Sequence, residues 1–213
     1  MSLTFYYGSG SPYAWRVWLA LEHKRIPYEM KVLSFSAGEH KTPEYLAINP
    51  RHRVPAIVDE GFALYESAAI LEYLDDQYGG EPRLFPGDAR KRALARRMVR
   101  EADQYFAEAL EVLVDNILFT PPEQWAEAPI AKARAALNRE LASWEKLIAA
   151  DWLAGELSAA DFTLYPQIAL MLRIGTKKPD LNLRGLIGPK IAAWMARMEA
   201  LPCLKKTWPP HWS

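Results

Sequence analysis

The sequence has little cysteine, no excess charge of either sign and no long apolar run, and each absence excludes a class of protein. One cysteine, Cys203, among 213 residues excludes a disulfide within the chain and a metal site built from several thiolates. Lys plus Arg equals Asp plus Glu at 26 each, so the charge balance gives no general reason to expect nucleic-acid or acidic-membrane binding. No segment approaches the ~18 apolar residues of a transmembrane helix, and the start resembles no signal peptide, so we expect a cytoplasmic protein.

What the sequence does contain changes character near residue 80. The first part alternates short strand and helix patterns: strands are expected at 3–8, 28–35 and in a hairpin at 54–67, and helices at 12–24 and 67–78. Residues 80–88 are rich in glycine and proline, as in a linker. Helical patterns follow at 89–118, 130–149 and 188–201, and in the apolar segment 151–175, whose helix is expected to start at Ser158. The sequence therefore predicts a small α/β domain at 1–79, a linker at 80–88 and an all-helical domain at 89–213.

Two serines mark expected helix starts that could also bind an anion. In the stretch GSGSPYAWRV, Ser11 precedes Pro12 as an N-cap precedes a proline at the first helical position. The same geometry places Ser11 at the positive end of a helix, where free N–H groups attract negative charge. Ser67 is expected to cap the helix at 67–78, with Glu66 beside it. A third serine, Ser158, forms a capping box with Asp161, and we expect it to act in folding only.

Three stretches resemble the cytosolic glutathione transferases: SPYAWRV at 11–17, EHKTPEYLAINPRHRVPAIVDEGFALYESAAILEYL at 39–74, and LAGELSAADFTLYP at 153–166. The middle stretch places a Val-Pro, a hairpin and a Glu-Ser in the order and spacing of that family. The resemblance covers essentially the whole chain. It implies a thioredoxin-like domain followed by a helical domain, glutathione as co-substrate, no metal, and a homodimer.

The resemblance gives the Ser11 region a chemical role. In SPYA, Ser11 and Ala14 stand where thioredoxin-like oxidoreductases carry the two cysteines of Cys-Pro-Tyr-Cys. Dithiol–disulfide exchange is therefore unavailable to this chain. The pattern is similar to serine-type transferases, in which the serine hydroxyl donates a hydrogen bond to the glutathione thiolate, which is the nucleophile. Ser9 and the tyrosine pair Tyr6 and Tyr7 remain alternatives for this hydrogen bond.

The resemblance also implies the residues that bind the rest of glutathione. A cis Val54-Pro55 bond is expected to pair with the cysteinyl backbone in the manner of a short strand. The Ser67 hydroxyl and amide are expected to bind the γ-glutamyl carboxylate, and Glu66 the ammonium group. Lys41, Arg53 and His40 are the candidates for the glycine carboxylate. His52 departs from the family, in which glycine is common at this position.

The second substrate is expected to bind between the two domains, where clefts form. The aromatic candidates for this apolar pocket are Tyr13, Phe35, Tyr105, Phe106 and Phe119. The expected activity is attack of the glutathione thiolate on an apolar electrophile, a detoxification reaction. Two alternatives stay open: a glutathione-dependent isomerase or dehalogenase, and a non-catalytic module that binds glutathione or another ligand.

Overall fold

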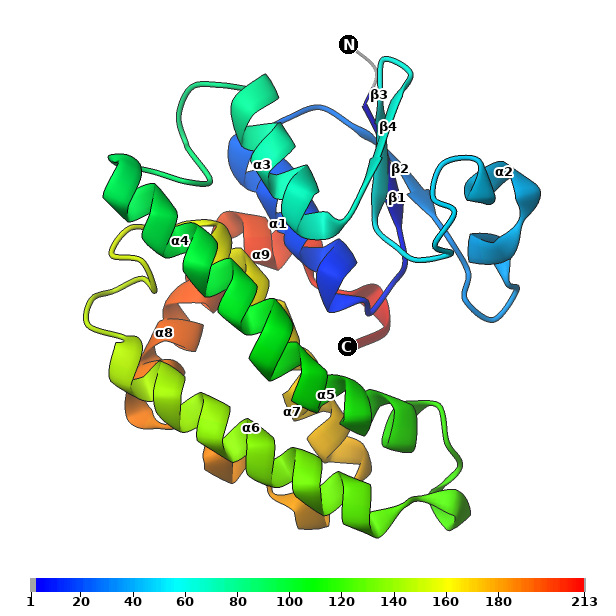
Figure 1. Ribbon diagram of the computed structural model, residues 1–213, viewed down its shortest axis with the longest axis vertical. Helices are drawn as coiled ribbons and strands as arrows, with labels where there is room; N and C mark the ends of the chain where they lie inside the picture. Colours follow the sequence, from blue (N-terminus) through cyan, green and yellow to red (C-terminus); the bar gives the residue numbers. More distant parts are fainter. Residues whose placement is uncertain (1–2, 213) are drawn as a thin grey trace. The chain divides into compact units, whose positions relative to one another are not determined.

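A computed structural model describes residues 3–212, which form two compact units (Figure 1). The first unit contains the described residues up to Pro86 together with those from Leu201 onward. The second unit is Gly87–Ala200. The last segment of the chain thus returns to the first unit, although sequence reasoning grouped it with the helical domain.

The first unit is built on a four-stranded sheet, within the described residues, in the order β2-β1-β3-β4. The strands are β1 (Leu3–Tyr7), β2 (Glu29–Val32), β3 (Ala56–Asp59) and β4 (Phe62–Tyr65). β1 is parallel to β2 and antiparallel to β3, with Phe5 opposite both Met30 and Ile57. β3 and β4 form the predicted hairpin, in which Ile57 is opposite Leu64.

The first unit also contains the α-helices α1 (Pro12–Lys24), α2 (Pro43–Leu46), α3 (Ser67–Gln77) and α9 (Pro202–Thr207). α1 and α3 pack on each other beside the sheet, and α2 lies beyond the strands (Figure 1). α9 packs on α1. Short 3-10 turns occur at Glu39–Lys41 and Pro210–Trp212. This arrangement matches the predicted α/β domain and adds a C-terminal helix to it.

α1 forms where local sequence signals favour a helix. Ser11 caps its N-terminus, because the Ser11 Oγ accepts a hydrogen bond from the Ala14 N–H at 3.3 Å. Pro12 occupies the first helical position, where its missing N–H costs nothing. Arg25 ends the helix in the left-handed region at φ 56°. Apolar side chains such as Trp15 and Val17 are buried against the rest of the unit.

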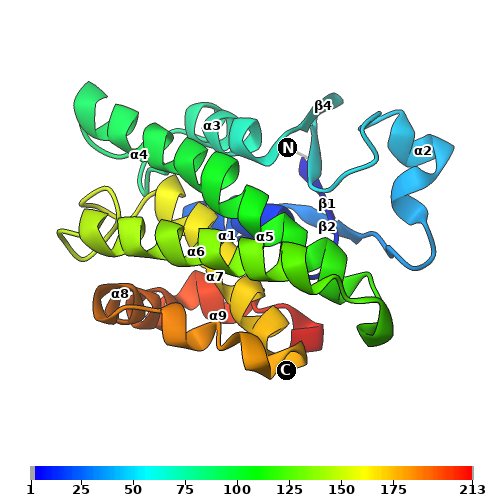
Figure 2. The same cartoon turned by 60° about the horizontal axis from the view of Figure 1, so that its bottom comes forward.

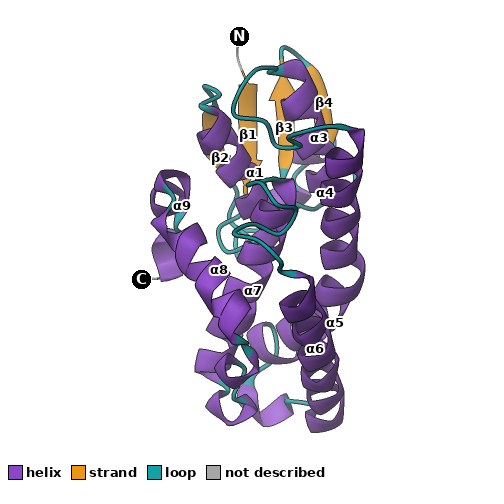
Figure 3. Cartoon of the chain, turned by 90° about the vertical axis from the view of Figure 1, so that its left-hand side faces the viewer, coloured by secondary structure: helices purple, strands orange, loops and turns teal. Residues whose placement is uncertain are grey.

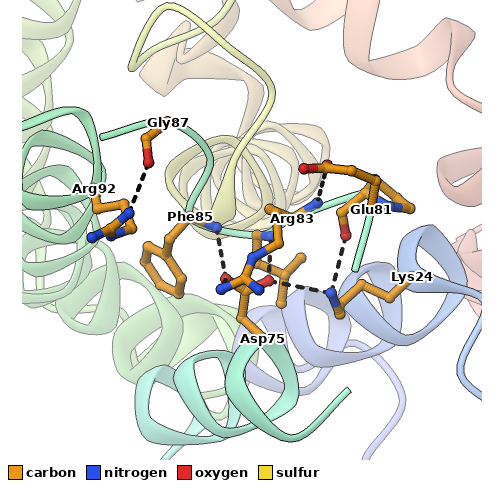
Figure 4. Close-up of polar contacts among 9 residues, drawn as sticks. Lys24, Asp75, Glu81, Arg83, Phe85, Gly87 and Arg92 are labelled. Atoms are coloured by element: carbon orange, nitrogen blue, oxygen red, sulfur yellow. Dashed lines mark hydrogen bonds and ion pairs between the residues drawn. The ribbon is translucent and has the colours of Figure 1, made fainter. Parts of the chain in front are cut away.

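Asp75 of α3 binds the segment just before Pro86, which is the last part of the first unit before the helical unit begins (Figure 4). Its Oδ1 accepts from the Leu84 N–H at 2.7 Å and from the Lys24 Nζ at 3.2 Å. Its Oδ2 accepts from the Phe85 N–H at 3.3 Å and lies 3.2 Å from the Arg83 guanidinium. The side chains of Asp75 and Lys24 are each only 2% exposed. The middle of the expected linker, at 83–85, is therefore held to α3 and α1 by a buried charge cluster.

We expect the Asp75→Ala variant to lose about 3 kcal/mol or more of unfolding free energy, because the mutation leaves the buried Lys24 ammonium without a carboxylate. The urea midpoint measures this loss. Asp76→Ala is the matched control, since Asp76 is exposed and its loss should cost less than about 0.5 kcal/mol. Equal midpoints for the two variants would contradict the assignment.

The second unit is helical throughout its regular elements (Figure 3). Its α-helices are α4 (Ala89–Glu101), α5 (Ala107–Leu113), α6 (Glu127–Leu147), α7 (Ala159–Lys177) and α8 (Pro189–Ala200). α4 and α5 continue one another and α6 packs along α5, while α7 packs against α4 and α5 (Figure 2). Most of α7 is buried, from Ala159 to Met171. The core of this unit therefore surrounds α7.

The helical stretch predicted at 89–118 is continuous but changes its hydrogen-bond pattern twice. Ala102–Phe106 and Val114–Leu118 are π-helical. The Phe119 N–H bonds to the Val114 carbonyl five residues earlier, at 3.3 Å, and not to the carbonyl four residues earlier. The 3.6-residue pattern could not show these wider turns, which change the directions of the side chains that follow them.

The capping box predicted at α7 is present. Asp161 Oδ2 accepts from the Ser158 N–H at 2.9 Å and from the Ser158 hydroxyl at 3.1 Å. Its Oδ1 accepts from the Leu153 N–H at 3.0 Å and from the Trp194 indole N–H at 2.8 Å. Asp161 therefore also joins the loop before α7 and the side chain of an α8 residue to the start of α7.

Candidate active site

Ser11 ends the loop that connects β1 to α1. The Ser11 N–H donates to the Gly8 carbonyl at 3.1 Å, which closes the loop. The Ser11 Oγ accepts the Ala14 N–H, so the hydroxyl keeps its own proton for another acceptor. Accepting a bond from an amide also polarises the hydroxyl and strengthens it as a donor. Ser11 is half-buried at the positive end of a 13-residue helix.

Gly8 brings this loop close to two other predicted site residues. A Cβ placed on Gly8 would lie 2.5 Å from the Phe35 ring and 2.7 Å from a Val54 methyl. A side chain at Gly8 would therefore displace Phe35 or Val54. The end of β1, the loop after β2 and the segment before β3 thus meet at one glycine.

The alternative hydrogen-bond donors to Ser11 are Tyr6, Tyr7 and Ser9, and their hydroxyl groups lie in different environments. Tyr7 is 2% exposed, and burial raises its pKa, an effect that the Ser9 hydroxyl and the Gly10 backbone only partly offset. Its hydroxyl makes no hydrogen bond of standard geometry within the described residues. The Tyr6 ring packs 5.6 Å from the Tyr45 ring. The Ser9 hydroxyl lies 2.8 Å from Nδ1 of His211.

The segment before β3 contains the predicted cis peptide bond between Val54 and Pro55. The preceding carbonyl, that of Arg53, accepts from the Tyr45 hydroxyl at 2.6 Å and from the Asn49 amide at 2.7 Å. His52 has φ 58°, a left-handed conformation that glycine adopts without strain. The loop thus keeps at His52 the backbone conformation that favours the glycine common in the family.

Ser67 differs from the prediction in one respect: it is the first residue of α3, and the N-cap is Glu66 at φ 70°. The Ser67 Oγ accepts a hydrogen bond from the Arg16 guanidinium of α1, a buried partner that sequence reasoning missed. Arg16 is 3% exposed and also lies over the Tyr13 ring, 5.4 Å from its centroid. Its position among apolar residues of α1 was the available signal.

The basic candidates occupy the segment around α2 and the loop after it. Lys41 and Arg53 are exposed. His40 has a lowered pKa because of burial, and because Lys41 and His52 add positive charge nearby. Its Nδ1 is enclosed and makes no hydrogen bond within residues 3–212. The lowered pKa favours a neutral imidazole, which can form a hydrogen bond but carries no charge. Of the three candidates, Lys41 and Arg53 are therefore the ones that supply positive charge.

The aromatic candidates are divided between the two units. In the first unit, Phe35 is 44% exposed and Tyr13 is half-buried. In the second unit, Phe119 is 76% and Tyr105 56% exposed, whereas Phe106 is fully enclosed. Phe106 thus has the environment of a core residue, while the other four are accessible within their own units.

Both parts of the chain are similar to known proteins. A glutathione S-transferase N-terminal domain model matches residues 10–77, and a glutathione S-transferase C-terminal domain model matches 123–197. A solved glutathione S-transferase from the Antarctic clam Laternula elliptica is 32% identical, with a TM-score of 0.82 over 100% of this chain and 94% of that one. The chain belongs to the glutathione S-transferase family.

Two further relatives support the same family. Glutathione S-transferase A of Pleuronectes platessa is 28% identical over 99% of this chain and 92% of its own length. A glutathione transferase from Burkholderia graminis, solved with two glutathione molecules per subunit, is 26% identical, with a TM-score of 0.85 over 97% of this chain and 87% of that one. The thioredoxin-like and helical domains expected for a glutathione transferase are both present.

None of the helices within residues 3–212 combines the length and the apolar character needed to cross a membrane. Among the same residues, no group of three or more His, Cys, Asp or Glu side chains is placed to bind a metal ion.

Proposed function

We propose that this glutathione transferase is a serine-type enzyme, in which the Ser11 hydroxyl donates a hydrogen bond to the thiolate of bound glutathione. The observation that carries the proposal is the Ser11 cap. The Oγ accepts from Ala14 and keeps its proton at the positive end of α1. Both features favour the thiolate over the thiol, and the thiolate is the nucleophile.

The reaction then needs no covalent step on the protein. The thiol proton leaves to solvent, and the sulfur lone pair forms a C–S bond with an electrophilic carbon. With an aryl halide, the carbon–halogen bond breaks and halide leaves. The candidate contacts for an apolar electrophile are the accessible aromatic residues Tyr13, Phe35, Tyr105 and Phe119, and the enclosed Phe106 is the weakest member of the predicted set.

The γ-glutamyl end of glutathione is assigned to the start of α3. The Ser67 Oγ accepts from the buried Arg16 guanidinium, so the Ser67 hydroxyl proton is available to a carboxylate. The Arg16 cation beside it stabilises the added negative charge. Glu66 is exposed and supplies a carboxylate for the ammonium group. An anion site and a cation site therefore lie on consecutive residues.

The cysteinyl and glycine parts of glutathione are assigned to the two loops beside Gly8. The Val54-Pro55 segment would pair with the cysteinyl backbone. Lys41 and Arg53 supply positive charge for the glycine carboxylate, and His40 is the third candidate, with its Nδ1 enclosed in this structure. Residues 1–79 would thus bind glutathione. After the linker at 80–88, the proposed domain 89–213 would complete the enzyme, although its described residues from Leu201 onward pack with the first unit. We further propose a cytoplasmic homodimer with a role in detoxification.

We expect Ser67→Ala to raise KM for glutathione about 10-fold or more with a smaller change in kcat, because a hydrogen bond to a charged group contributes about 1.5–3 kcal/mol. Steady-state kinetics with varied glutathione and saturating aryl halide measure both constants. Ser143→Ala is the control, since Ser143 is exposed on α6 and bonds only locally to the Arg139 carbonyl. An unchanged KM in Ser67→Ala would contradict the carboxylate assignment.

The activity itself is tested by mass spectrometry of the product formed from glutathione and an aryl halide. A glutathione conjugate that requires the enzyme supports the proposed reaction. Turnover of an isomerisation substrate without such a conjugate would favour the isomerase alternative. Retention on a glutathione column with neither activity would favour a binding module.

A further inference from the structure

The C-terminal segment, far from Ser11 in sequence, packs on the beginning of α1. The Trp15 indole N–H donates to the Thr207 hydroxyl at 2.9 Å. The Trp15 ring also makes edge contacts with Trp208 and Trp212, at centroid distances of 5.5 and 5.3 Å. Because Trp15 lies four residues after Ser11, this cluster anchors the C-terminal segment beside the loop that carries Ser11.

From this anchor, His211 reaches the loop directly. Its Nδ1 lies 2.8 Å from the Ser9 Oγ, and its Nε2 accepts the Trp212 indole N–H at 3.0 Å. An indole nitrogen can only donate, so Nε2 of a neutral His211 is the unprotonated nitrogen. The proton is therefore on Nδ1 and is donated to Ser9, whose hydroxyl keeps its own proton for another acceptor.

The imidazole also lies against the backbone of the loop. Gly10 has φ 87°, and a Cβ placed there would lie 3.0 Å from Nε2 and 3.1 Å from Cε1 of His211. The ring thus fits where Gly10 has no side chain. His211 contacts two consecutive residues of the loop, Ser9 by a hydrogen bond and Gly10 by packing.

We propose that His211 is a positioning residue for the thiol site: it fixes Ser9 and Gly10, and thereby holds the loop that orients the Ser11 hydroxyl. The inference rests on the proposed activation of glutathione at this loop. Without His211 the loop keeps the Ser11 N–H bond to Gly8 and the cap on α1, but loses the contacts that fix Ser9 and Gly10. Misplacement of a donor weakens its stabilisation of the thiolate while leaving the rest of the glutathione site intact.

The test compares His211→Ala, His211→Asn and Ser9→Ala by thiolate absorbance of bound glutathione against pH and by steady-state kinetics. We expect His211→Ala to raise the pKa of the bound thiol and to lower kcat about 10-fold, with KM for glutathione changed less than twofold. His211→Asn keeps an N–H donor near the Nδ1 position and should recover most of the loss. Ser9→Ala should lower kcat to a similar extent. The double variant, Ser9→Ala with His211→Ala, should lower kcat little further than either single variant, since both mutations remove the same hydrogen bond.

Lys206→Ala is the control, because it removes the 2.7 Å ion pair of Lys206 with Glu22 from the same segment without touching the loop. A bound-thiol pKa in His211→Ala equal to that of the unmodified protein would overturn the inference. Equal losses in His211→Ala, His211→Asn and Lys206→Ala would also overturn it, because they would indicate general packing.

Ser11→Ala, measured in parallel, separates this inference from the proposed function. If Ser11→Ala raises the pKa of the bound thiol and His211→Ala does not, the inference about His211 alone fails. If His211→Ala and Ser9→Ala raise the pKa and Ser11→Ala does not, the Ser11 assignment fails and His211 acts through Ser9.

Discussion

Replacing Ser11 with alanine should lower kcat by about 10²-fold or more, the usual cost of losing one donor to an anion that must be stabilised for reaction. KM for glutathione should change little, because the γ-glutamyl and glycine ends of the ligand are assigned to other residues. Steady-state kinetics with an aryl halide at fixed pH measure the two constants separately.

The Ser11→Ala variant also loses the cap on α1, at a cost of about 1 kcal/mol in unfolding free energy. Ser11→Asp separates the two roles, because an aspartate caps a helix well but carries no proton to donate. We expect Ser11→Asp to retain most of the stability and to be as inactive as Ser11→Ala, whereas Ser11→Thr should keep both properties. A Ser11→Asp variant with nearly full kcat would contradict the role of the hydroxyl.

The second large effect that we expect is a loss of stability on replacing Asp161. We expect Asp161→Ala to lower the unfolding free energy by about 3–5 kcal/mol, since it leaves the buried donors of Leu153, Ser158 and Trp194 without their acceptor. Urea unfolding measures the loss, and Asp151→Ala is the control because the Asp151 side chain is 81% exposed. A loss in Asp161→Ala no larger than the ~1 kcal/mol of a simple cap would contradict the role of Asp161 as a shared acceptor.

The Asp161 carboxyl should also make the unfolding free energy depend on pH. Burial raises the pKa of Asp161 to about 6 from 3.8, although the donors around it oppose the shift. Between pH 3.8 and about 6, the folded protein therefore keeps the Asp161 proton, whereas the unfolded chain has released it. The resulting stability is fully present below pH ~3.8 and is lost as pH rises through about 6.

Asp161→Asn isolates this titration, because asparagine does not ionise. The difference in unfolding free energy between the unmodified protein and Asp161→Asn should decrease between pH 4 and 7, by an amount on the order of 3 kcal/mol. Urea midpoints at several pH values follow the difference. A difference that stays constant across this range would contradict the raised pKa.

Much of the fold followed from short-range sequence signals. Ser11-Pro12 predicted the start of α1, and Ser158 predicted the start of α7. The strand pattern at 54–67 predicted the hairpin of β3 and β4. Each signal acts within a few residues, which is why it can be read from sequence. The π-helical turns at Ala102–Phe106 and Val114–Leu118 leave no comparable trace in the 3.6-residue pattern.

Less of the candidate site than of the fold could be predicted from the sequence. Ser11, its alternative Ser9, and Val54-Pro55 could be proposed because the resemblance assigned them roles. Arg16 and Ser67 are 51 positions apart, and Ser9 and His211 are 202 apart, so no local pattern joins either pair. Only the packing of α1 against α3 and α9 brings these groups together.

A pH titration of thiolate absorbance in the bound complex measures whether the Ser11 hydroxyl stabilises the glutathione thiolate. We expect a thiol pKa in the unmodified protein at least 1 unit below that of free glutathione in the same buffer, and a return of about 1–2 units toward the free value in Ser11→Ala. The same bound-thiol pKa in both proteins would contradict this role of Ser11.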